Sequence, residues 1–377
     1  LERGANSIQF VNEINSKNDF DTLLKGIDIE IIHLHFYNPN PNQTLNFLTS
    51  FCEKRNIKPI NLKGSISYDY LGELLIRGNW NTGQHEDLSE IFAISKVPNP
   101  FKTISVNGLY FNNAGSTIIQ ELAFSFCQAV EYLNYLTDNN LDVKNISNKF
   151  VFNFGISSNY FFEIAKIRAA KILWKLILNQ YNVSDTPIYI NSVSTFTNFS
   201  CFDEHNNILR TTTEAMSAII GGSNSIYVLP FDKLLGTSPK SSDRIAINIL
   251  HILKEEAFLD KVSDASKGSY YIESLTDEMV EKSLQLFKEI EQKGGFLANI
   301  KNGFIQESIH RVAKQKQEGY DSCEKTLLGV NKHRNTTSIK IIPMTKIKKA
   351  NNNGLVPTLQ LVRFAEEIET REFFQNV

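Results

Sequence analysis

The stretch SVNGLYFNNAGSTIIQELAFSFCQAVEYLNYL, residues 105–136, decides the fold. It predicts a short strand, then a small polar turn at residues 112–115, then a helix whose apolar residues recur every three or four positions. Thr117 and Gln120 have the spacing of a capping box, which satisfies free N–H groups at the first turn of a helix. One strand, one loop and one amphipathic helix are therefore the unit to seek along the chain.

The same alternation recurs on both sides of this stretch. Further β-like runs cover residues 7–11, 29–36, 57–62, 149–155, 187–192 and 225–229. Helical patterns cover residues 20–25, 43–55, 209–220, 244–258 and 277–293, and another begins near Asn159. Between residues 62 and 104 we expect a long irregular connection that is rich in Gly, Tyr and Asn. The helix over residues 209–220 should end at Gly221-Gly222, because glycine is the usual residue after a helix.

Seven strand–helix pairs in series predict a parallel α/β architecture. We expect a TIM (β/α)8 barrel over residues 1–332 that lacks part of its first strand–helix unit, with the eighth pair lying before Leu1. A doubly wound open sheet is the alternative, and it would usually carry a Gly-rich phosphate loop after its first strand. Neither GxGxxG nor GxxxxGK[ST] occurs, which favours the barrel.

Residues 333–377 are predicted to form a C-terminal extension that leaves the barrel. A basic stretch covers residues 332–349, and a short helix is expected over residues 359–372. The six basic residues of the stretch are Lys332, Arg334, Lys340, Lys346, Lys348 and Lys349. They could contact a partner or an anionic ligand, but a solvated linker is the favoured interpretation.

Composition excludes several classes of partner. The 377 residues include 42% hydrophobic and 21% charged residues, and the formal net charge is −2, which gives no field to attract nucleic acid. No apolar run approaches the roughly 20 residues that span a bilayer, so no membrane association is expected. The four cysteines are scattered and form no CxxC pair, which is typical of a reducing compartment such as the cytoplasm.

Two histidines raise the possibility of metal chemistry. His33 and His35 are two residues apart on a predicted strand, so both side chains point the same way and could bind one ion. A metal-dependent TIM-barrel hydrolase is therefore an alternative function. It lacks obvious further ligands, because the later strands offer asparagines and Asp232.

The segment Asp203-Glu204-His205 is close to D-x-H-x-x-G, a motif by which some enzymes place a histidine on the cobalt of cobalamin. The glycine of that motif allows the corrin to approach closely, and Ile208 stands in its place here. We therefore expect this segment to be structural.

Seven blocks, in one order, resemble the coenzyme A-binding barrel of the methylmalonyl-CoA mutase family, and the resemblance extends over residues 4–332. The blocks are residues 77–87 (RGNWNTGQHED), 108–122 (GLYFNNAGSTIIQEL), 154–174 (FGISSNYFFEIAKIRAAKILW), 206–222 (NNILRTTTEAMSAIIGG), 244–256, 264–276 (DASKGSYYIESLT) and 329–332 (GVNK).

This resemblance implies an adenosylcobalamin-dependent isomerase that interconverts (R)-methylmalonyl-CoA and succinyl-CoA by a radical route. It also implies that coenzyme A threads the barrel axis and that a separate C-terminal domain binds cobalamin. Small or polar side chains would then have to line the axis, which would explain Asn107, Asn153, Ser157 and Asn191 in otherwise β-rich runs.

One departure from the family pattern bears on activity. Catalytic chains of the family have Gly-Tyr-His-Met-Gln-Glu-Ala-Gly where this chain has GLYFNNAG at residues 108–115, so Leu109 and Tyr110 replace the tyrosine and histidine that sit over the substrate. Losing a positioned general acid typically costs about 10²–10⁴-fold in rate. Tyrosine, with an ordinary pKa of about 10, is a poor substitute.

The chain thus resembles the small, non-catalytic subunit of a two-chain mutase, paired in a heterodimer with a large catalytic subunit that binds adenosylcobalamin. No catalytic residue and no cofactor are expected in this chain. A remnant of the substrate pocket is expected at Leu109, Tyr110, Asn112, Asn191 and Glu255. The alternative within the family is a self-sufficient mutase that acts with a separate cobalamin-binding chain and uses Tyr110 in place of the histidine.

Overall fold

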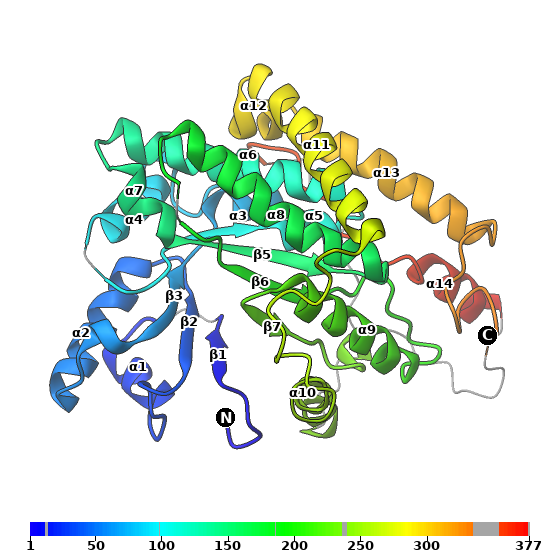
Figure 1. Cartoon of the computed structure of the whole chain (residues 1–377), viewed down its shortest axis with the longest axis horizontal. Coiled ribbons are helices and arrows are strands. Elements are labelled where there is room, and N and C mark those ends of the chain that lie inside the picture. The colour runs from blue at the N-terminus through cyan, green and yellow to red at the C-terminus, as the bar shows by residue number, and fades with distance from the viewer. Residues whose placement is uncertain (12–13, 98, 185, 236–239, 335–353, 376–377) are drawn as a thin grey trace.

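The described part of the chain folds around seven parallel strands. The computed structural model describes residues 1–11, 14–97, 99–184, 186–235, 240–334 and 354–375. The strands are β1 (Ser7–Phe10), β2 (His33–Tyr37), β3 (Lys63–Ser67), β4 (Ile104–Asn107), β5 (Phe150–Ile156), β6 (Ile190–Ser194) and β7 (Ser225–Tyr227). They pair in chain order as β1-β2-β3 and β4-β5-β6-β7, and a parallel bridge between Ser65 and Lys102 joins the two groups. The result is a curled parallel sheet shaped as part of a barrel (Figure 1).

Helices surround this sheet (Figure 1). They are α1 (Lys17–Leu23), α2 (Pro41–Arg55), α3 (Tyr70–Arg77), α4 (Gln84–Lys96), α5 (Gly108–Asn113), α6 (Ile118–Asp138), α7 (Val143–Ile146), α8 (Tyr160–Gln180), α9 (Asn206–Gly221), α10 (Lys240–His251), α11 (Tyr270–Gln292), α12 (Gly295–Lys301), α13 (Phe304–Asp321) and α14 (Glu366–Gln375). Of these, α11 packs against both α6 and α8 as an outer layer. None of the described helices combines the length and apolarity that crossing a bilayer requires.

Strands β1 and β7 stand at the two ends of the strand order. A cleft of about 690 Å³ lies between them and is lined by Ile8 of β1 and Tyr227 of β7. The order and direction of the strands agree with the barrel prediction for seven of its eight strands. The eighth stays a prediction.

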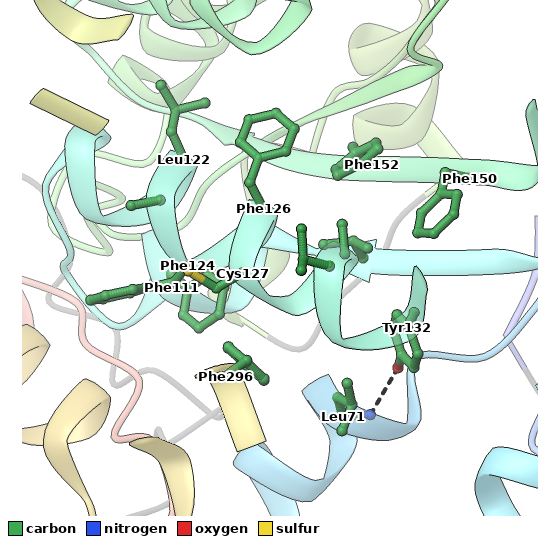
Figure 2. Packing of buried hydrophobic residues seen from close by; sticks show 14 of the residues in the cluster. Leu71, Phe111, Leu122, Phe124, Phe126, Cys127, Tyr132, Phe150, Phe152 and Phe296 are labelled. Atoms are coloured by element: carbon green, nitrogen blue, oxygen red, sulfur yellow. Dashed lines mark hydrogen bonds between the residues drawn. The ribbon is translucent and has the colours of Figure 1, made fainter. Parts of the chain in front are cut away.

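The core confirms the role of residues 105–136. Thr117 caps α6 through its hydroxyl oxygen, which accepts from Gln120 N at 3.1 Å, while Gln120 Oε1 accepts from Thr117 N at 2.9 Å, so the predicted capping box is present. Figure 2 shows the apolar face of this helix packed on the neighbouring strand, with the Phe126 and Phe152 ring centroids 5.3 Å apart. On the other side, Tyr132 accepts a hydrogen bond from Leu71 N of α3 at 3.0 Å.

The prediction for the third strand is wrong by about one strand length. Residues 57–62 were expected to form it, but Pro59–Asn61 form a 3₁₀ turn and the strand is Lys63–Ser67. Proline has no N–H to donate to a strand ladder, which weakens the apolar run. Gly64 has φ +136°, and a Cβ there would lie 1.7 Å from Leu34 O, so only glycine lets β3 approach β2 so closely.

Three local predictions also need correction. The connection before β4 is not irregular, because it contains β3, α3 and α4, and Gly78 ends α3 in the left-handed conformation. The turn expected at residues 112–115 is shorter, since Asn112 and Asn113 complete the last turn of α5. Strand β2 begins at His33 rather than at residue 29. The helix predicted over residues 209–220 is confirmed, with Gly222 as its left-handed cap.

The C-terminal segment does not leave the barrel. Its backbone donates from Leu359 N to Leu75 O (2.9 Å) and from Val362 N to Asn113 O (2.8 Å), so it crosses the rim where strands end. Helix α14 begins at Glu366, later than the predicted residue 359. Most of the basic stretch over residues 332–349 lies outside the described residues, and the domain boundary at Lys332 stays a prediction.

Candidate functional site

Three asparagines predicted to line the barrel axis form one row. Asn107, Asn153 and Asn191 pair in register across β4, β5 and β6. Asn153 Nδ2 donates to Asn107 Oδ1 at 2.7 Å, and Asn191 Nδ2 donates to Asn153 Oδ1 at 2.9 Å. The amides therefore bind one another across the inside of the sheet, which lets three polar side chains lie among apolar strands.

Two tyrosines and one carboxylate continue this row. Asn107 Nδ2 donates to the Tyr37 hydroxyl at 3.2 Å, and Glu73 Oε1 accepts from both Tyr37 (2.9 Å) and Tyr110 (2.6 Å). Arg77, one turn along α3, donates to Glu73 Oε2 at 2.7 Å. We call Tyr37, Glu73 and Tyr110 the phenol plug.

The two hydroxyls of the phenol plug act as hydrogen-bond donors to Glu73. Burial raises the pKa of Tyr37 and of Tyr110 well above the ordinary value, and the negative charge of Glu73 raises both further. Both phenols thus stay protonated near neutral pH, and each is bonded to the same carboxylate oxygen. Tyr110 is therefore a weaker acid than free tyrosine.

A small cavity lies along the barrel axis beside this network. This axial cavity holds about 90 Å³, and serines from four strands line it together with His35, Tyr37, Asn153 and Asn191. Cavities that bind drug-sized molecules are several times larger, about 300–1,000 Å³. Serines and asparagines line it as predicted, but larger side chains such as Tyr37 and Tyr227 line it too, and the space is narrow.

The methylmalonyl-CoA mutase family model matches residues 11–370 of the chain. The chain belongs to this family. The Porphyromonas gingivalis protein named methylmalonyl-CoA mutase small subunit is 33% identical over 97% of this chain and 60% of its own length. A methylmalonyl-CoA mutase of Rhizobium meliloti is 31% identical over 95% of this chain and 51% of its own length. The large subunit of Propionibacterium freudenreichii subsp. shermanii is 31% identical over 75% of this chain and 40% of its own length.

These figures confirm the family resemblance that the sequence blocks predicted. The chain spans between half and two thirds of the first two of these mutases. What those proteins do as wholes therefore comes to this chain only as a proposal.

The structure brings only some of the predicted pocket residues together. Tyr110 and Asn191 belong to the axial network described above. Leu109 lies half-buried beside Tyr110 on α5. Glu255 is 64% exposed and pairs with Lys254 at 2.9 Å in the turn after α10, so the structure places it apart from the axial network. The predicted remnant pocket is thus divided.

Asn112 belongs to a different group, a buried charge cluster at the start of α6 and α8. Its Nδ2 donates to Glu121 Oε2 at 2.9 Å, and Lys166 lies 2.9 Å from the same oxygen and 2.6 Å from Glu163 Oε2. The Lys166 and Glu121 side chains are 0% exposed. Burial alone would favour a neutral amine, but the two carboxylates outweigh it and raise the pKa of Lys166. Lys166 is therefore charged.

The sequence analysis missed Glu73 and Tyr37, although one signal was present. Glu73 is the only acidic residue of the otherwise apolar helix α3 (YLGELLIR), and it lies four residues before Arg77. Such spacing predicts an ion pair on one helix face. Nothing in the local sequence indicates that a tyrosine of β2 and a tyrosine of α5 would share the same carboxylate.

The histidines proposed for a metal site lie at the start and in the middle of β2, away from its carboxyl end. Their ring centroids are 6.5 Å apart, and His35 Nδ1 lies 2.9 Å from Ser65 Oγ. Burial, helped by the nearby His33, lowers the pKa of His35 to about 4. Across the described ranges, no group of three or more His, Cys, Asp or Glu side chains is placed to hold a metal. The hydrolase alternative therefore gains no third ligand from the described residues.

The Asp203-Glu204-His205 segment does not fit a cobalt ligand. The His205 side chain is 70% exposed, its ring stacks on Phe231 with centroids 5.2 Å apart, and it forms the N-cap of α9. Ile208 lies in the first turn of that helix, where a bulky side chain replaces the glycine of the motif. These residues therefore leave no close approach for the corrin of cobalamin.

Proposed function

We propose that this chain is the small subunit of a heterodimeric, adenosylcobalamin-dependent methylmalonyl-CoA mutase, non-catalytic in itself and supporting a large catalytic subunit. The observation that carries the proposal is the phenol plug, because Tyr37, Glu73 and Tyr110 occupy the barrel interior that the family resemblance assigns to the substrate. An axial cavity of about 90 Å³ leaves little room for an acyl-CoA thioester.

The protonation of the plug supports the same conclusion. A general acid must lose its proton readily near the working pH. Tyr110 holds its proton against Glu73 and has a raised pKa, while the neighbouring Leu109 has no proton to give. The two positions at which the family resemblance expects catalytic groups thus supply neither an acid nor a base.

Adenosylcobalamin supplies the radical in the reaction of the family, and we propose that the large subunit holds it. The one stretch of this chain with a partial cobalt-binding motif has an exposed histidine and Ile208 in place of glycine. The names of the relatives, one a small subunit and another a large subunit, support a two-chain arrangement. A cytoplasmic location stays a prediction.

Co-expression with a large mutase subunit tests the proposal directly. We expect the two chains to co-purify as a 1:1 complex in size-exclusion chromatography, with the cobalamin absorption spectrum absent from the isolated small chain. Elution of this chain as a monomer beside its large partner would contradict the heterodimer.

The variant Tyr110→Phe separates the two family alternatives. In a non-catalytic subunit it should leave kcat of the complex within about twofold, because it removes only one donor to Glu73. In a self-sufficient mutase acting with a separate cobalamin-binding chain, the same change should lower kcat by about 10²-fold or more. Leu109→Ala is the matched control on the same turn of α5.

A further inference from the structure

A pocket near the strand ends lies off the barrel axis. This rim pocket of about 620 Å³ lies between the loops that follow β4, β5 and β6 and the helices α11 and α13. It shares no lining residue with the axial cavity. Its volume is in the range of pockets that bind small organic molecules.

Three lysines line the rim pocket. Lys282 of α11, Lys316 of α13 and Lys325 line it, and Glu278 is the acidic residue among its lining side chains. Glu278 is paired with Lys282 at 2.5 Å. No described residue forms a salt bridge with Lys316 or Lys325, and Lys316 Nζ donates to Ser116 O at 2.7 Å.

Lys316 is held in an unfavourable environment for its charge. Burial and the neighbouring positive charge of Lys325 lower its pKa to about 8. An anion placed between the two lysines would be attracted to both and would restore the ordinary stability of the ammonium form.

Two buried polar side chains of the rim pocket each have one side-chain oxygen without a partner. Ser116 is 5% exposed and its hydroxyl is unpaired, and Asn198 is 7% exposed with an unpaired amide oxygen. Asn198 Nδ2 donates to Ser158 Oγ at 2.9 Å. Since a hydroxyl can donate as well as accept, the amide can turn over and present its NH₂ to the pocket. Buried polar groups are normally paired, so these two indicate a polar ligand.

Two helix N-termini border the rim pocket. Helices α6 and α8 are each 21 residues long, and their N-cap residues Thr117 and Asn159 line the rim pocket. The Asn159 side chain makes no capping hydrogen bond, so free N–H groups of α8 remain at this end. Helix N-termini attract anions through these groups and the helix dipole.

The rest of the rim pocket is apolar. Ile118, Phe162, Met279 and Phe364 form this part of the wall, and Phe364 is fixed there by its N–H, which donates to Thr197 O at 2.9 Å. The C-terminal segment therefore completes the pocket. A ligand that fits must carry a charged head and an apolar body.

We propose that the rim pocket binds a phosphate monoester with an apolar organic part, its phosphate on Ser116, Lys316 and Lys325. A phosphate monoester carries between one and two negative charges near neutral pH and three acceptor oxygens, which matches two lysines and one hydroxyl better than a carboxylate does. This site is independent of the proposed function, because it uses none of the phenol plug.

Calorimetric titration of the purified chain with phenyl phosphate tests the proposal. Three comparison ligands are used. Benzoate replaces the phosphate by a carboxylate, phenol has the ring without the anion, and inorganic phosphate has the anion without the ring. We expect phenyl phosphate to bind at least tenfold more tightly than each of them. Phenol lacks the charge, inorganic phosphate lacks the apolar part, and benzoate has one charge and two acceptor oxygens where the phosphate has more charge and three.

The variant Lys316→Gln should weaken phenyl phosphate binding about tenfold or more, and Ser116→Ala should weaken it about threefold. Lys314→Gln is the matched control, since Lys314 is exposed on the same helix two residues away and is not among the pocket residues. Its affinity should equal that of the unchanged chain.

Three results would overturn the proposal: no binding of phenyl phosphate, equal binding of benzoate, or equal affinity in Lys316→Gln and Lys314→Gln. Near-UV circular dichroism checks that Lys316→Gln is folded. If it is not, Lys325→Gln takes its place, because Lys325 is exposed and lines the same side of the pocket, and the same tenfold loss is expected.

Discussion

Strands β4, β5 and β6 border the axial cavity, and the loops that follow the same strands border the rim pocket. The axial cavity is about 90 Å³ and the rim pocket about 620 Å³. Along the axis, amides and phenols bind one another and Glu73 already has Arg77 as its counter-charge. At the rim, Lys316 and Lys325 have no carboxylate partner among the described residues.

The difference lies in a few bulky side chains. Tyr110 on the first turn of α5 and Tyr37 at the end of β2 fill the axis, while the corresponding loops after β5 and β6 carry serine, threonine and asparagine and leave the rim open. The curled parallel sheet thus has a narrow cavity on its inside and a wider pocket at its rim. The predictions below test whether the two regions are energetically separate.

The largest effect is expected at the buried charge cluster between the two regions. Lys166→Met leaves Glu121 and Glu163 buried beside each other with no counter-charge, and breaking such a group typically costs about 3–5 kcal/mol of unfolding free energy. Urea denaturation followed by circular dichroism measures it. Lys175→Met, at an exposed position of the same helix, should change stability by less than about 0.5 kcal/mol.

The close contact around this cluster explains why so large an effect is expected. Lys166 also donates to Gly155 O, and a Cβ at Gly155 would lie 2.7 Å from Asn112 Cβ, so strand β5 and helix α5 have no slack there. A loss below about 1 kcal/mol in Lys166→Met would mean that the carboxylates find other partners.

The next effect is expected at the phenol plug. Glu73→Leu removes the acceptor for two phenols and the partner of Arg77, and should lower the unfolding free energy by about 3 kcal/mol. Tyr110→Phe is the control, because it removes one donor and should cost about 1 kcal/mol. Equal losses in the two variants, measured by urea denaturation, would show that the plug is not held together by Glu73.

These two regions also show what the sequence could and could not predict. The capping box of α6 and the end of α9 at Gly222 are local, and both were predictable from neighbouring residues. The row Asn107–Asn153–Asn191 was predictable as polar lining, because each asparagine stands in an apolar strand. The strand register that joins them follows from pairing between segments far apart in the chain.

The failures have long-range causes. The apolar run over residues 57–62 does not form the strand, because Pro59 interrupts it and because Gly64 lets the following residues approach β2 closely. This close approach depends on Leu34 of the neighbouring strand, which the local sequence does not reveal. The C-terminal segment was expected to leave the barrel because it follows the basic stretch over residues 332–349. Its residues Val356 and Phe364 are instead buried on the rim. Glu255 follows the buried Leu253 by two residues and so points outward from the helix.

A smaller, pH-dependent effect is expected beside the axial cavity. His35 has a pKa of about 4 in the folded chain and 6.5 in the unfolded chain. Between pH 6.5 and pH 4 the unfolded chain therefore binds a proton at His35 that the folded chain does not bind. The stability from neutral His35 is present above pH 6.5 and is lost as pH falls toward 4, with about 2 kcal/mol lost by pH 5.

The variant His35→Asn isolates this contribution. Unfolding free energies measured by urea denaturation at pH 7 and pH 4.5 should differ less in the variant than in the unchanged chain. His33→Asn is the control, because burial and Lys63 lower the pKa of His33 from a less buried position. A variant whose pH dependence matches that of the unchanged chain would show that His35 titrates normally.

The smallest effect is expected at the exposed side of the rim pocket. Lys282 pairs with Glu278 one turn away on α11, and both side chains are more than half exposed. Such pairs contribute about 0.3–0.5 kcal/mol, so Lys282→Gln should leave the urea midpoint almost unchanged. It should nevertheless weaken phenyl phosphate binding two- to threefold at low salt, because the charge still acts on the pocket.

Substitution of Glu278, the acidic partner of Lys282, tests whether affinity follows the charge of the rim pocket. Glu278→Gln removes the acidic residue among the pocket-lining side chains, and should strengthen phenyl phosphate binding two- to threefold with no more effect on stability than Lys282→Gln. Opposite shifts in affinity at constant stability would mean that the rim is organised by charge for a ligand. Affinity changes in the same direction would mean that the two variants act by disturbing α11. The rim pocket would then not differ from the axial network, in which the charged groups stabilise the fold.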